Sequence, residues 1–186
     1  RCFVSYIYSK YCLSDIVFKA GDGFHRAYVD YKGGRSYDVR LSMNDVTSVI
    51  RDNNSFVLNT GVPHYVRFVD NLDSESFIDD SRKIRYSNRF MPEGINVDFA
   101  KYEGDMIFLR TYERGVENET LSCGTGVVAA AISSYYINSG KGKDIVRKVL
   151  TKGGELTVSY NVDNDVFYNI FLEGNVNFVF SGVVEI

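Results

Sequence analysis

The chain has 186 residues, which is enough for one large domain or two small ones with a real hydrophobic core. Its net charge of −3 argues against a nucleic-acid surface, and its longest apolar stretch, Val127 to Ile132, is too short to span a membrane. Three widely spaced cysteines and two histidines make no zinc pattern, so we expect no metal and free thiols in a reducing, cytoplasmic compartment.

The first quarter of the chain predicts a short helix followed by an antiparallel meander. Residues 1–12 begin without an N-cap residue, as if inside a helix, and this beginning leads us to expect that a preceding segment has been lost. Alternating apolar residues between glycine turns then predict strands at residues 15–20, 24–31 and 35–43. We expect His25, in the second of these strands, to face solvent and to have no role in function. The polar segment 44–53 predicts a linker at a domain boundary.

The remaining residues predict a second β-rich block that surrounds one apolar helix. The charged segment 71–85 predicts a surface helix, and the Val- and Ala-rich segment 127–138, with Gly140 as its stop signal, predicts a buried one. Alternation predicts strands at residues 55–60, 65–70, 95–102, 106–113, 144–152, 155–162, 166–173 and 177–186. The predicted class is therefore α+β, with much antiparallel sheet and few helices.

The densest group of reactive residues, 112–126, lies directly before this buried helix. Cys123 falls where free backbone N–H groups and the positive end of the helix dipole stabilise a thiolate. The Gly124-Thr125-Gly126 segment lets those N–H groups approach a carboxylate or phosphate. Glu113 can accept a bond from an ammonium group, and Arg114 can donate two bonds to a carboxylate. These residues predict a site for a zwitterionic amino acid beside an ionisable thiol, although a buried structural cysteine stays an alternative.

Several motifs in order resemble those of the pyridoxal-independent diaminopimelate epimerases, over essentially the whole chain. The segment Glu113-Arg114-Gly115, with Glu119-Thr120-Leu121-Ser122-Cys123-Gly124-Thr125-Gly126 and the Ala-rich helix, resembles that family's second cysteine motif. Gly61-Val62-Pro63-His64 resembles its Gly-Asn-Pro-His loop, and Gly94-Ile95-Asn96-Val97 its Ala-Asn-(Ile/Val) segment. Arg1-Cys2-Phe3 resembles the tail of the first cysteine motif, which would place the family's first catalytic cysteine ahead of Arg1.

The resemblance implies a fold of two pseudo-symmetric α+β domains, each an antiparallel-rich sheet wrapped around a central helix. The first domain would be incomplete here: residues 1–44 would be its remnant, with residues 176–186 returning to it. Residues 45–175 would form the C-terminal epimerase domain, which carries the second catalytic cysteine. The resemblance also implies a homodimer, with Phe180 at an aromatic position of its interface.

The activity implied is cofactor-free interconversion of LL- and meso-2,6-diaminopimelate, for lysine and peptidoglycan precursor synthesis. Two thiols on opposite faces of the substrate Cα would exchange its proton, with electrostatics in place of a pyridoxal electron sink. Cys123 would be one of these thiols, assisted by Glu113 and His64. The residues that hold the substrate by its ammonium and carboxylate groups would be Asn96, Glu113, Arg114, Gly124 and Thr125. The isolated chain, with one thiol of the two, is expected to be inactive until the missing segment is restored.

Other interpretations stay open at this point. Val62 stands where the family has an asparagine that contacts substrate, and valine cannot donate that hydrogen bond. A related racemase or isomerase of the same fold, such as a proline or hydroxyproline racemase or a phenazine-biosynthesis-type isomerase, is one alternative. A hydrolase using Cys123, His64 and Glu113 is a second, and a truncated, non-catalytic remnant is a third. We expect Glu117 and Glu119 to solvate or cap the loop, and Cys2 and Cys12 to be structural.

Overall fold

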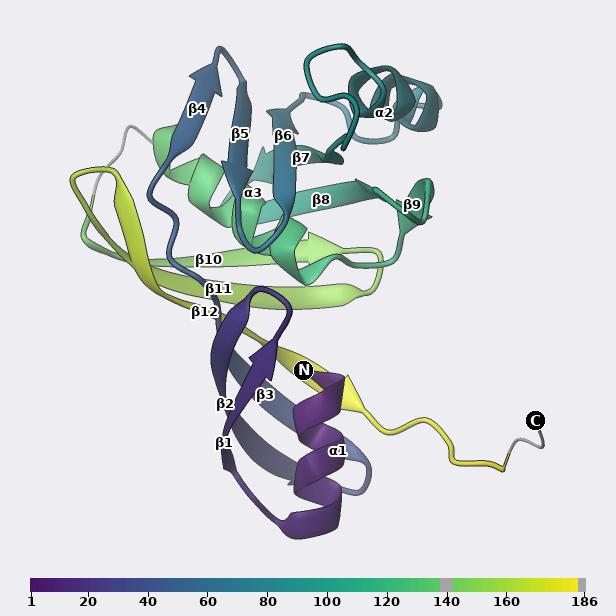
Figure 1. The fold of residues 1–186 in the computed structure, drawn as a ribbon, viewed down its shortest axis with the longest axis vertical. Helices are drawn as coiled ribbons and strands as arrows, with labels where there is room; N and C mark the ends of the chain where they lie inside the picture. Colours follow the sequence, from purple (N-terminus) through teal and green to yellow (C-terminus); the bar gives the residue numbers. More distant parts are fainter. Residues whose placement is uncertain (138–141, 184–186) are drawn as a thin grey trace.

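The computed structural model is an α+β fold in which one curved sheet runs through the whole chain (Figure 1), and it describes residues 1–137 and 142–183. In these residues the sheet has twelve strands in the order β1-β2-β3-β12-β11-β10-β8-β7-β6-β5-β4, with β9 paired to β8. The strands are β1 Asp15–Ala20, β2 Gly23–Gly33, β3 Ser36–Ser42, β4 Val49–Asp52, β5 Ser55–Asn59, β6 Pro63–Phe68, β7 Asn96–Glu103, β8 Met106–Glu113, β9 Asn118–Thr120, β10 Asp144–Thr151, β11 Gly154–Asp163 and β12 Val166–Asn177. The helices are α1 Cys2–Tyr11, α2 Phe77–Arg85 and α3 Gly124–Ile137.

The lower part of the molecule in Figure 1 is the meander β1–β3 with α1 packed on one face. Alternate residues of β2 and β3 point toward α1 and form a small core with it: Val4, Ala27, Val29, Tyr37 and Val39. The predicted helix in residues 1–12 and the predicted meander are therefore confirmed.

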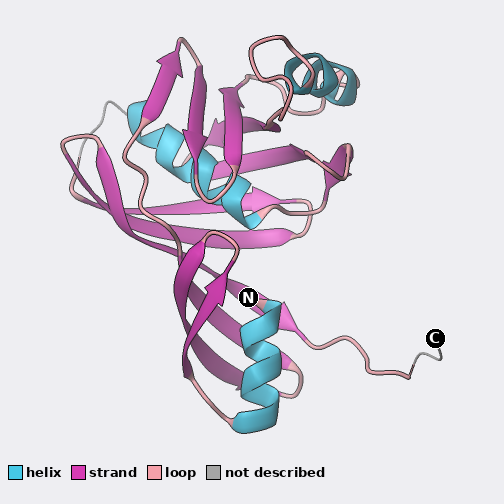
Figure 2. Ribbon diagram, in the orientation of Figure 1, coloured by secondary structure: helices cyan, strands magenta, loops and turns pink. Residues whose placement is uncertain are grey.

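Helix α3 lies within the upper part of the sheet, with strands on several sides (Figure 2). A helix that is apolar all round is stable only when it is enclosed, and this one contacts β5 to β8 and β10 to β12. Ala129, Ala130 and Ala131 are fully buried, and their small side chains let the strands approach the helix closely. The predicted buried helix is confirmed up to Ile137, whereas its predicted end at Asn138 and the stop at Gly140 lie outside the described residues.

The strand β7 is buried on both faces, because α3 covers one and a second apolar cluster covers the other. That second cluster contains Phe77 of α2, packed edge-on against Phe99 at a ring distance of 5.3 Å. The predicted helix at residues 71–85 is shorter in the structure, since it begins at Phe77. An Asx turn, in which Asp73 N–H donates to Asn71 Oδ1, occupies the residues before it.

Two sequence predictions about irregular segments are wrong in part. The segment 44–53, predicted to be a linker, contains β4, and Val46 within it is buried and pairs through backbone bonds with Phe167 at 2.8 and 2.9 Å. The break predicted between residues 173 and 177 does not exist, because β12 continues through Gly174. A Cβ at Gly174 would lie 2.3 Å from Leu156, so this glycine serves close packing rather than a turn. Residues 178–183 form no strand, and residues 184–186 of the predicted last strand lie outside the described residues.

Strand β12 is the element that joins the two parts of the molecule. Its first residues pair with β11, and residues Phe171 to Asn177 also pair with β3. The predicted domain division at residue 44 stays a prediction, and the pairing of β12 with β3 begins earlier than the predicted return at residue 176.

His25 is buried, contrary to the prediction that it faces solvent. It shares the inner face of β2 with Ala27 and Val29, and it stacks on Phe18 at a ring distance of 5.6 Å. Both ring nitrogens have partners at 2.9 Å, the Ser42 carbonyl and the Asp22 carboxylate. A histidine can therefore occupy this core position, because its polar atoms are satisfied.

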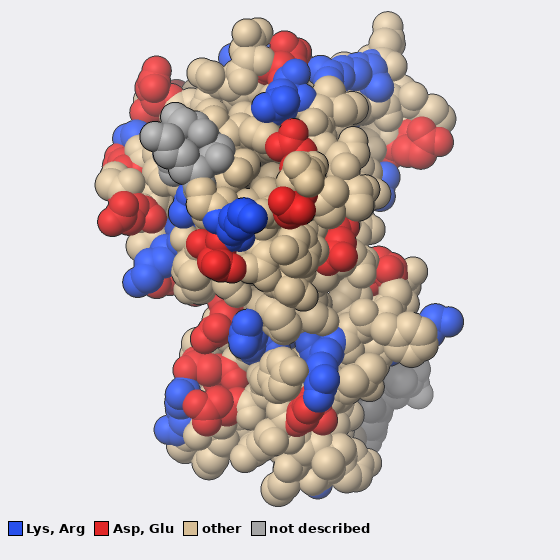
Figure 3. Space-filling view, turned by 90° about the vertical axis from the view of Figure 1, so that its left-hand side faces the viewer, with Lys and Arg blue, Asp and Glu red and all other residues tan. Residues whose placement is uncertain are grey.

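Cys2 and Cys12, predicted to be structural, are both exposed. On the face shown in Figure 3, acidic and basic side chains are intermixed. In the described part of the chain, every helix is too short or too polar to cross a bilayer.

Candidate active site

Cys123 is the residue immediately before α3, at the position that the motif predicted. Its carbonyl accepts the first bond of the helix, from Val127 N–H at 2.9 Å. The N–H groups of the first helical turn have no intrahelical acceptor, so this end of α3 favours a negative charge. The cysteine is 9% exposed, and its sulfur lies 3.3 Å from the Thr125 hydroxyl.

A row of buried polar groups leads from this sulfur into the protein. The Thr125 Oγ1 lies 2.9 Å from His64 Nε2, and His64 Nδ1 lies 2.6 Å from Asp98 Oδ2. The other carboxylate oxygen of Asp98 accepts a bond from the Thr111 hydroxyl at 2.6 Å. Both His64 and Asp98 are fully buried. The structure thus brings His64 to Cys123 and Thr125, which follow it by about 60 residues in the sequence.

Asp98 and Thr111 are members of this network that the sequence analysis missed. Asp98 is 34 residues from His64 in sequence, and nothing local pairs the two. A signal was present, because Asp98 lies between Val97 and Phe99 in a predicted strand, and a buried carboxylate almost always has a partner.

The loop that carries His64 is fastened to the start of α3. The hydroxyl of Thr60 donates to the Thr125 carbonyl at 2.9 Å. Gly61 has a φ of 113°, a left-handed conformation that suits glycine, and its N–H donates to Asn59 Oδ1. Val62, the departure from the family motif, lies in the turn that Thr60 N–H closes at 3.2 Å. These bonds hold His64 against the helix.

Asn96 and Arg114, predicted to hold a substrate carboxylate, are also used within the protein. Asn96 donates to the Pro63 carbonyl at 3.1 Å and accepts from Arg114 N–H at 2.8 Å. The Arg114 guanidinium lies 3.4 Å from the carbonyls of Glu93 and Gly94. Asn96 therefore ties the His64 loop to the end of β8, and the contact of both residues with substrate stays a prediction.

Glu113, predicted to act in catalysis, ends β8 and is partly buried. Its carboxylate accepts a bond from Thr120 Oγ1 at 2.5 Å. Thr120 belongs to β9, a short strand that is absent from the strands predicted from the sequence, and β9 folds back along β8. The strands β8 and β9 thus form a hairpin in which Glu113 pairs with Asn118. Cys123 lies three residues after the end of β9.

Two further glutamates fasten the same loop. Glu117 accepts bonds from Arg85 at 2.9 Å, Tyr86 at 2.8 Å and Gly115 N–H at 3.0 Å. Burial would raise the pKa of Glu117, but the bonds from Gly115, Tyr86 and Arg85 together lower it to about 2. Glu119 pairs with Arg110 and Lys152, each at 2.8 Å. Both carboxylates hold protein groups, in keeping with the expectation that they do not touch substrate.

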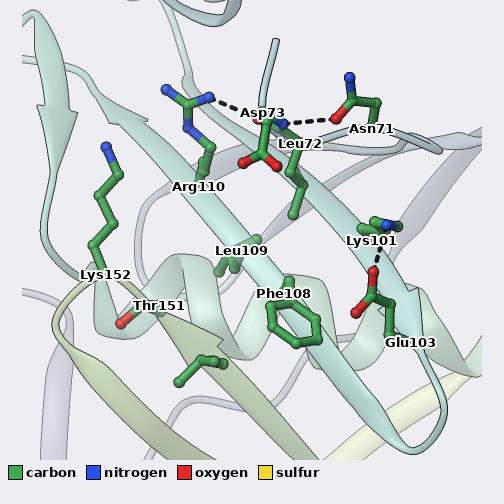
Figure 4. Close-up of a pocket in the computed structure, with 11 residues that line it drawn as sticks. Asn71, Leu72, Asp73, Lys101, Glu103, Phe108, Leu109, Arg110, Thr151 and Lys152 are labelled. Atoms are coloured by element: carbon green, nitrogen blue, oxygen red, sulfur yellow. Dashed lines mark hydrogen bonds and ion pairs between the residues drawn. The ribbon is translucent and has the colours of Figure 1, made fainter.

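A pocket of about 420 Å³ lies over β7, β8 and β10, and Figure 4 shows the residues that line it. Its lining does not include any of the predicted site residues. Its three cations are paired: Lys101 with Glu103, and both Arg110 and Lys152 with Glu119. These charges are already neutralised within the protein, so the thiol at the start of α3 is the stronger candidate for chemistry.

The charge of His64 depends on its neighbours. Burial alone would lower its pKa, but the nearby Asp98 carboxylate and the Cys123 sulfur outweigh burial and raise it to about 9. His64 is therefore an imidazolium at neutral pH, beside the carboxylate of Asp98.

We expect the stability contributed by His64 to fall as the pH rises. The pKa of His64 is about 6.5 in the unfolded chain and about 9 in the folded one, so the folded state holds the proton more tightly. The contribution is complete below about pH 6.5 and is lost as the pH rises through about 9, a change of about 3 kcal/mol. Urea unfolding of the unchanged chain at both ends of this range measures it, because Cys123 itself helps to raise this pKa. Asp98→Asn should flatten the slope, and an equally steep slope in that variant would contradict the assignment.

Comparison with solved structures defines the class of fold. A probable proline racemase from Agrobacterium radiobacter superposes with a TM-score of 0.69 at 16% identity, covering 98% of this chain and 66% of its own. A phenazine biosynthesis protein of the PhzF family from Bacillus anthracis superposes with a TM-score of 0.64 at 12% identity, covering 97% and 73%. The chain therefore has the α+β fold of these proteins, with a buried thiol at the start of its central helix.

Sequence comparison gives the family. The diaminopimelate epimerase family model matches residues 56–179. The diaminopimelate epimerases of Flavobacterium psychrophilum and Aquifex aeolicus are each 38% identical, over 99% and 98% of this chain, and that of Archaeoglobus fulgidus is 48% identical over 70% of it. The chain belongs to the diaminopimelate epimerase family.

The chain does not span the full length of these relatives. It covers 70% of the Flavobacterium protein, 66% of the Aquifex protein and 43% of the Archaeoglobus protein.

Proposed function

We propose that this chain supplies one half of the active site of an epimerase that interconverts LL- and meso-2,6-diaminopimelate. Cys123 is one of the two acid–base thiols, and the second belongs to a segment that the relatives have beyond the part matched here. The observation that carries the proposal is the position of Cys123, at the N-terminus of an enclosed helix and bonded to Thr125.

The surroundings of Cys123 suit proton exchange at an amino-acid Cα. Removing that proton creates negative charge on the α-carboxylate, and the N–H groups of Gly124 and Thr125 would stabilise this charge. Glu113 would receive the α-ammonium group, while Arg114 and Asn96 would hold the distal carboxylate. His64 acts through Thr125, and it needs no contact with substrate to do so.

The assembly proposed is a cytoplasmic homodimer. Phe180 is 81% exposed beyond the end of β12, and Val179 and Val183 of the same segment are 73% and 96% exposed, so several apolar side chains there face water. Burial of this ring against a second copy would account for its exposure in the single chain.

Proton exchange in deuterated water tests the proposal. The chain extended by the missing segment should incorporate deuterium at Cα of diaminopimelate and interconvert its stereoisomers, because it holds both thiols. The 186 residues alone should not interconvert the stereoisomers, since one thiol cannot serve both faces of Cα. Full activity of the 186 residues would contradict the two-thiol proposal, and exchange with proline but not diaminopimelate would favour the related racemases.

A further inference from the structure

The turn that follows β8, residues 114–117, carries Arg114 and contains a strained residue. Gly115 has a φ of 91° and Glu117 a φ of 58°, both in the left-handed region. This region suits glycine but disfavours glutamate, because Cβ then crowds the backbone. The Glu117 N–H closes the turn by donating to the Glu113 carbonyl at 2.8 Å. A strained residue of this kind persists only where its surroundings hold it in place, and such residues cluster at functional sites.

The carboxylate of Glu117 provides the restraint on its own backbone. One oxygen accepts bonds from Gly115 N–H at 3.0 Å and from Arg85 Nη2 at 2.9 Å. The other accepts from the hydroxyls of Tyr86 at 2.8 Å and Tyr112 at 3.3 Å. Arg85 is the donor that carries a charge, so its bond is the strongest of the four. The turn is therefore fastened to the last residue of α2.

Arg85 in turn depends on this carboxylate. The residue is 8% exposed, and its guanidinium lies directly against Gly94, where a Cβ would be 1.3 Å from Nη1. In the described part of the chain, Glu117 is the carboxylate that pairs with it. Removing one partner of such a pair leaves an uncompensated buried charge, which is strongly unfavourable. The ion pair thus holds both the turn and the Arg85 side chain.

The Arg114 side chain, in the same turn, is held much more weakly. Its backbone is fixed, because its N–H donates to Asn96 Oδ1 at 2.8 Å. Its guanidinium reaches the carbonyls of Glu93 and Gly94 at 3.4 Å, and it forms none of the ion pairs found among the described residues. The Glu93 carbonyl also lies 3.5 Å from Arg85, so the paired and the unpaired guanidinium groups are neighbours. The charge of Arg114 is available to a carboxylate from outside the protein.

We propose that Arg85 and Glu117 are positioning residues, whose ion pair holds Arg114 where it can bind the distal carboxylate of the substrate. Glu117 fixes the turn and also neutralises Arg85, which leaves Arg114 as the guanidinium that meets the anion. The ion pair acts through Arg114 and needs no contact with substrate. Its use in substrate binding rests on the proposed function, whereas its hold on the turn does not.

Amide hydrogen exchange in the 186-residue chain tests the hold on the turn. Glu117→Gln keeps the size of the side chain but removes the charge that pairs with Arg85. The Arg114 and Glu117 amides should then exchange about tenfold faster or more, because the turn opens more often. The Val127 amide, which closes the first turn of α3, should exchange at an unchanged rate. This difference separates loosening of the turn from unfolding of the whole chain.

Further variants keep the test decisive if Glu117→Gln folds poorly. Arg85→Met replaces the buried cation with an apolar chain and should speed the same two amides, whereas Arg85→Lys keeps the charge and should restore most of the slow exchange. Glu155→Gln is the matched control, since it breaks the exposed ion pair with Lys148 at 3.3 Å and should change neither amide. Unchanged exchange of both amides in Glu117→Gln and Arg85→Met would overturn the proposal.

Kinetics of the extended protein test the role in substrate binding. Arg85→Met and Glu117→Gln should each raise the KM for diaminopimelate about tenfold, with kcat changed by less than about threefold, because Arg114 holds a part of the substrate that does not react. L-Lysine, which has a hydrogen atom in place of the distal carboxylate, should inhibit with an unchanged constant. An unchanged KM, or equal weakening of diaminopimelate and lysine, would overturn the proposal. If the amides behave as expected while the extended protein exchanges no Cα proton, the proposed function fails and the hold on the turn stands.

Discussion

Replacing Cys123 with alanine in the extended protein is expected to lower epimerisation by about three orders of magnitude or more. The variant keeps the helix and the substrate contacts but has no group to accept or deliver the proton on its side of Cα. Stereoisomer interconversion and deuterium incorporation should both fall, while binding of diaminopimelate changes little. A stopped assay that separates the stereoisomers measures the first, and calorimetry measures the binding.

Cys12→Ser is the matched control for this loss. Cys12 is exposed at the end of α1, in the left-handed conformation with a φ of 55°. The control should retain the full rate, since the thiol there has no part in the site. A Cys123→Ala variant that kept even a tenth of the rate would remove Cys123 from the acid–base role.

Replacing Gly126 with valine is expected to cost about 3 kcal/mol of unfolding free energy, the upper range for an overpacked core. A Cβ at this position would lie 2.6 Å from Asp98 Oδ1 and 3.3 Å from both His64 Cε1 and Thr111 Oγ1. The buried carboxylate must move, and its two hydrogen bonds then lengthen or break. Urea unfolding of the chain measures the loss.

Gly21→Ala provides the comparison for that variant. A Cβ at Gly21 would meet nothing within 4 Å, and its φ is not in the left-handed region. The expected change there is within about 0.5 kcal/mol, as for other surface substitutions. Equal stability of Gly126→Val and the unchanged chain would mean that the start of α3 does not pack on the His64–Asp98 pair.

Much of the fold could be predicted from local patterns. Alternation of apolar residues marked β2 and β3, and the Val- and Ala-rich segment marked α3 as an enclosed helix. The errors arose where tertiary contacts override local pattern. Val46 is paired with Phe167 beside the sheet. Gly174 continues β12 because it pairs with Val39, and it is a glycine because a side chain there would collide with Leu156.

The sequence motifs predicted part of the candidate site. The position of Cys123 before a helix follows from the residues around it, and the structure agrees. The partners of His64 could not be found this way, because Asp98 and Thr125 are 34 and 61 residues away along the chain. Gly126 shows the same limit: we expected it to admit a ligand, whereas its hydrogen atom faces Asp98 and His64.

Alkylation of the extended protein tests most directly whether Cys123 performs the proton transfer. The protein, carrying Cys12→Ser, is treated with iodoacetamide, and peptide mass spectrometry follows the modification of each cysteine alongside the epimerisation rate. We predict that the epimerisation rate falls in proportion to the modified fraction of Cys123. Diaminopimelate should slow both the modification of Cys123 and the loss of activity. Complete modification of Cys123 with the rate of epimerisation retained would contradict the account.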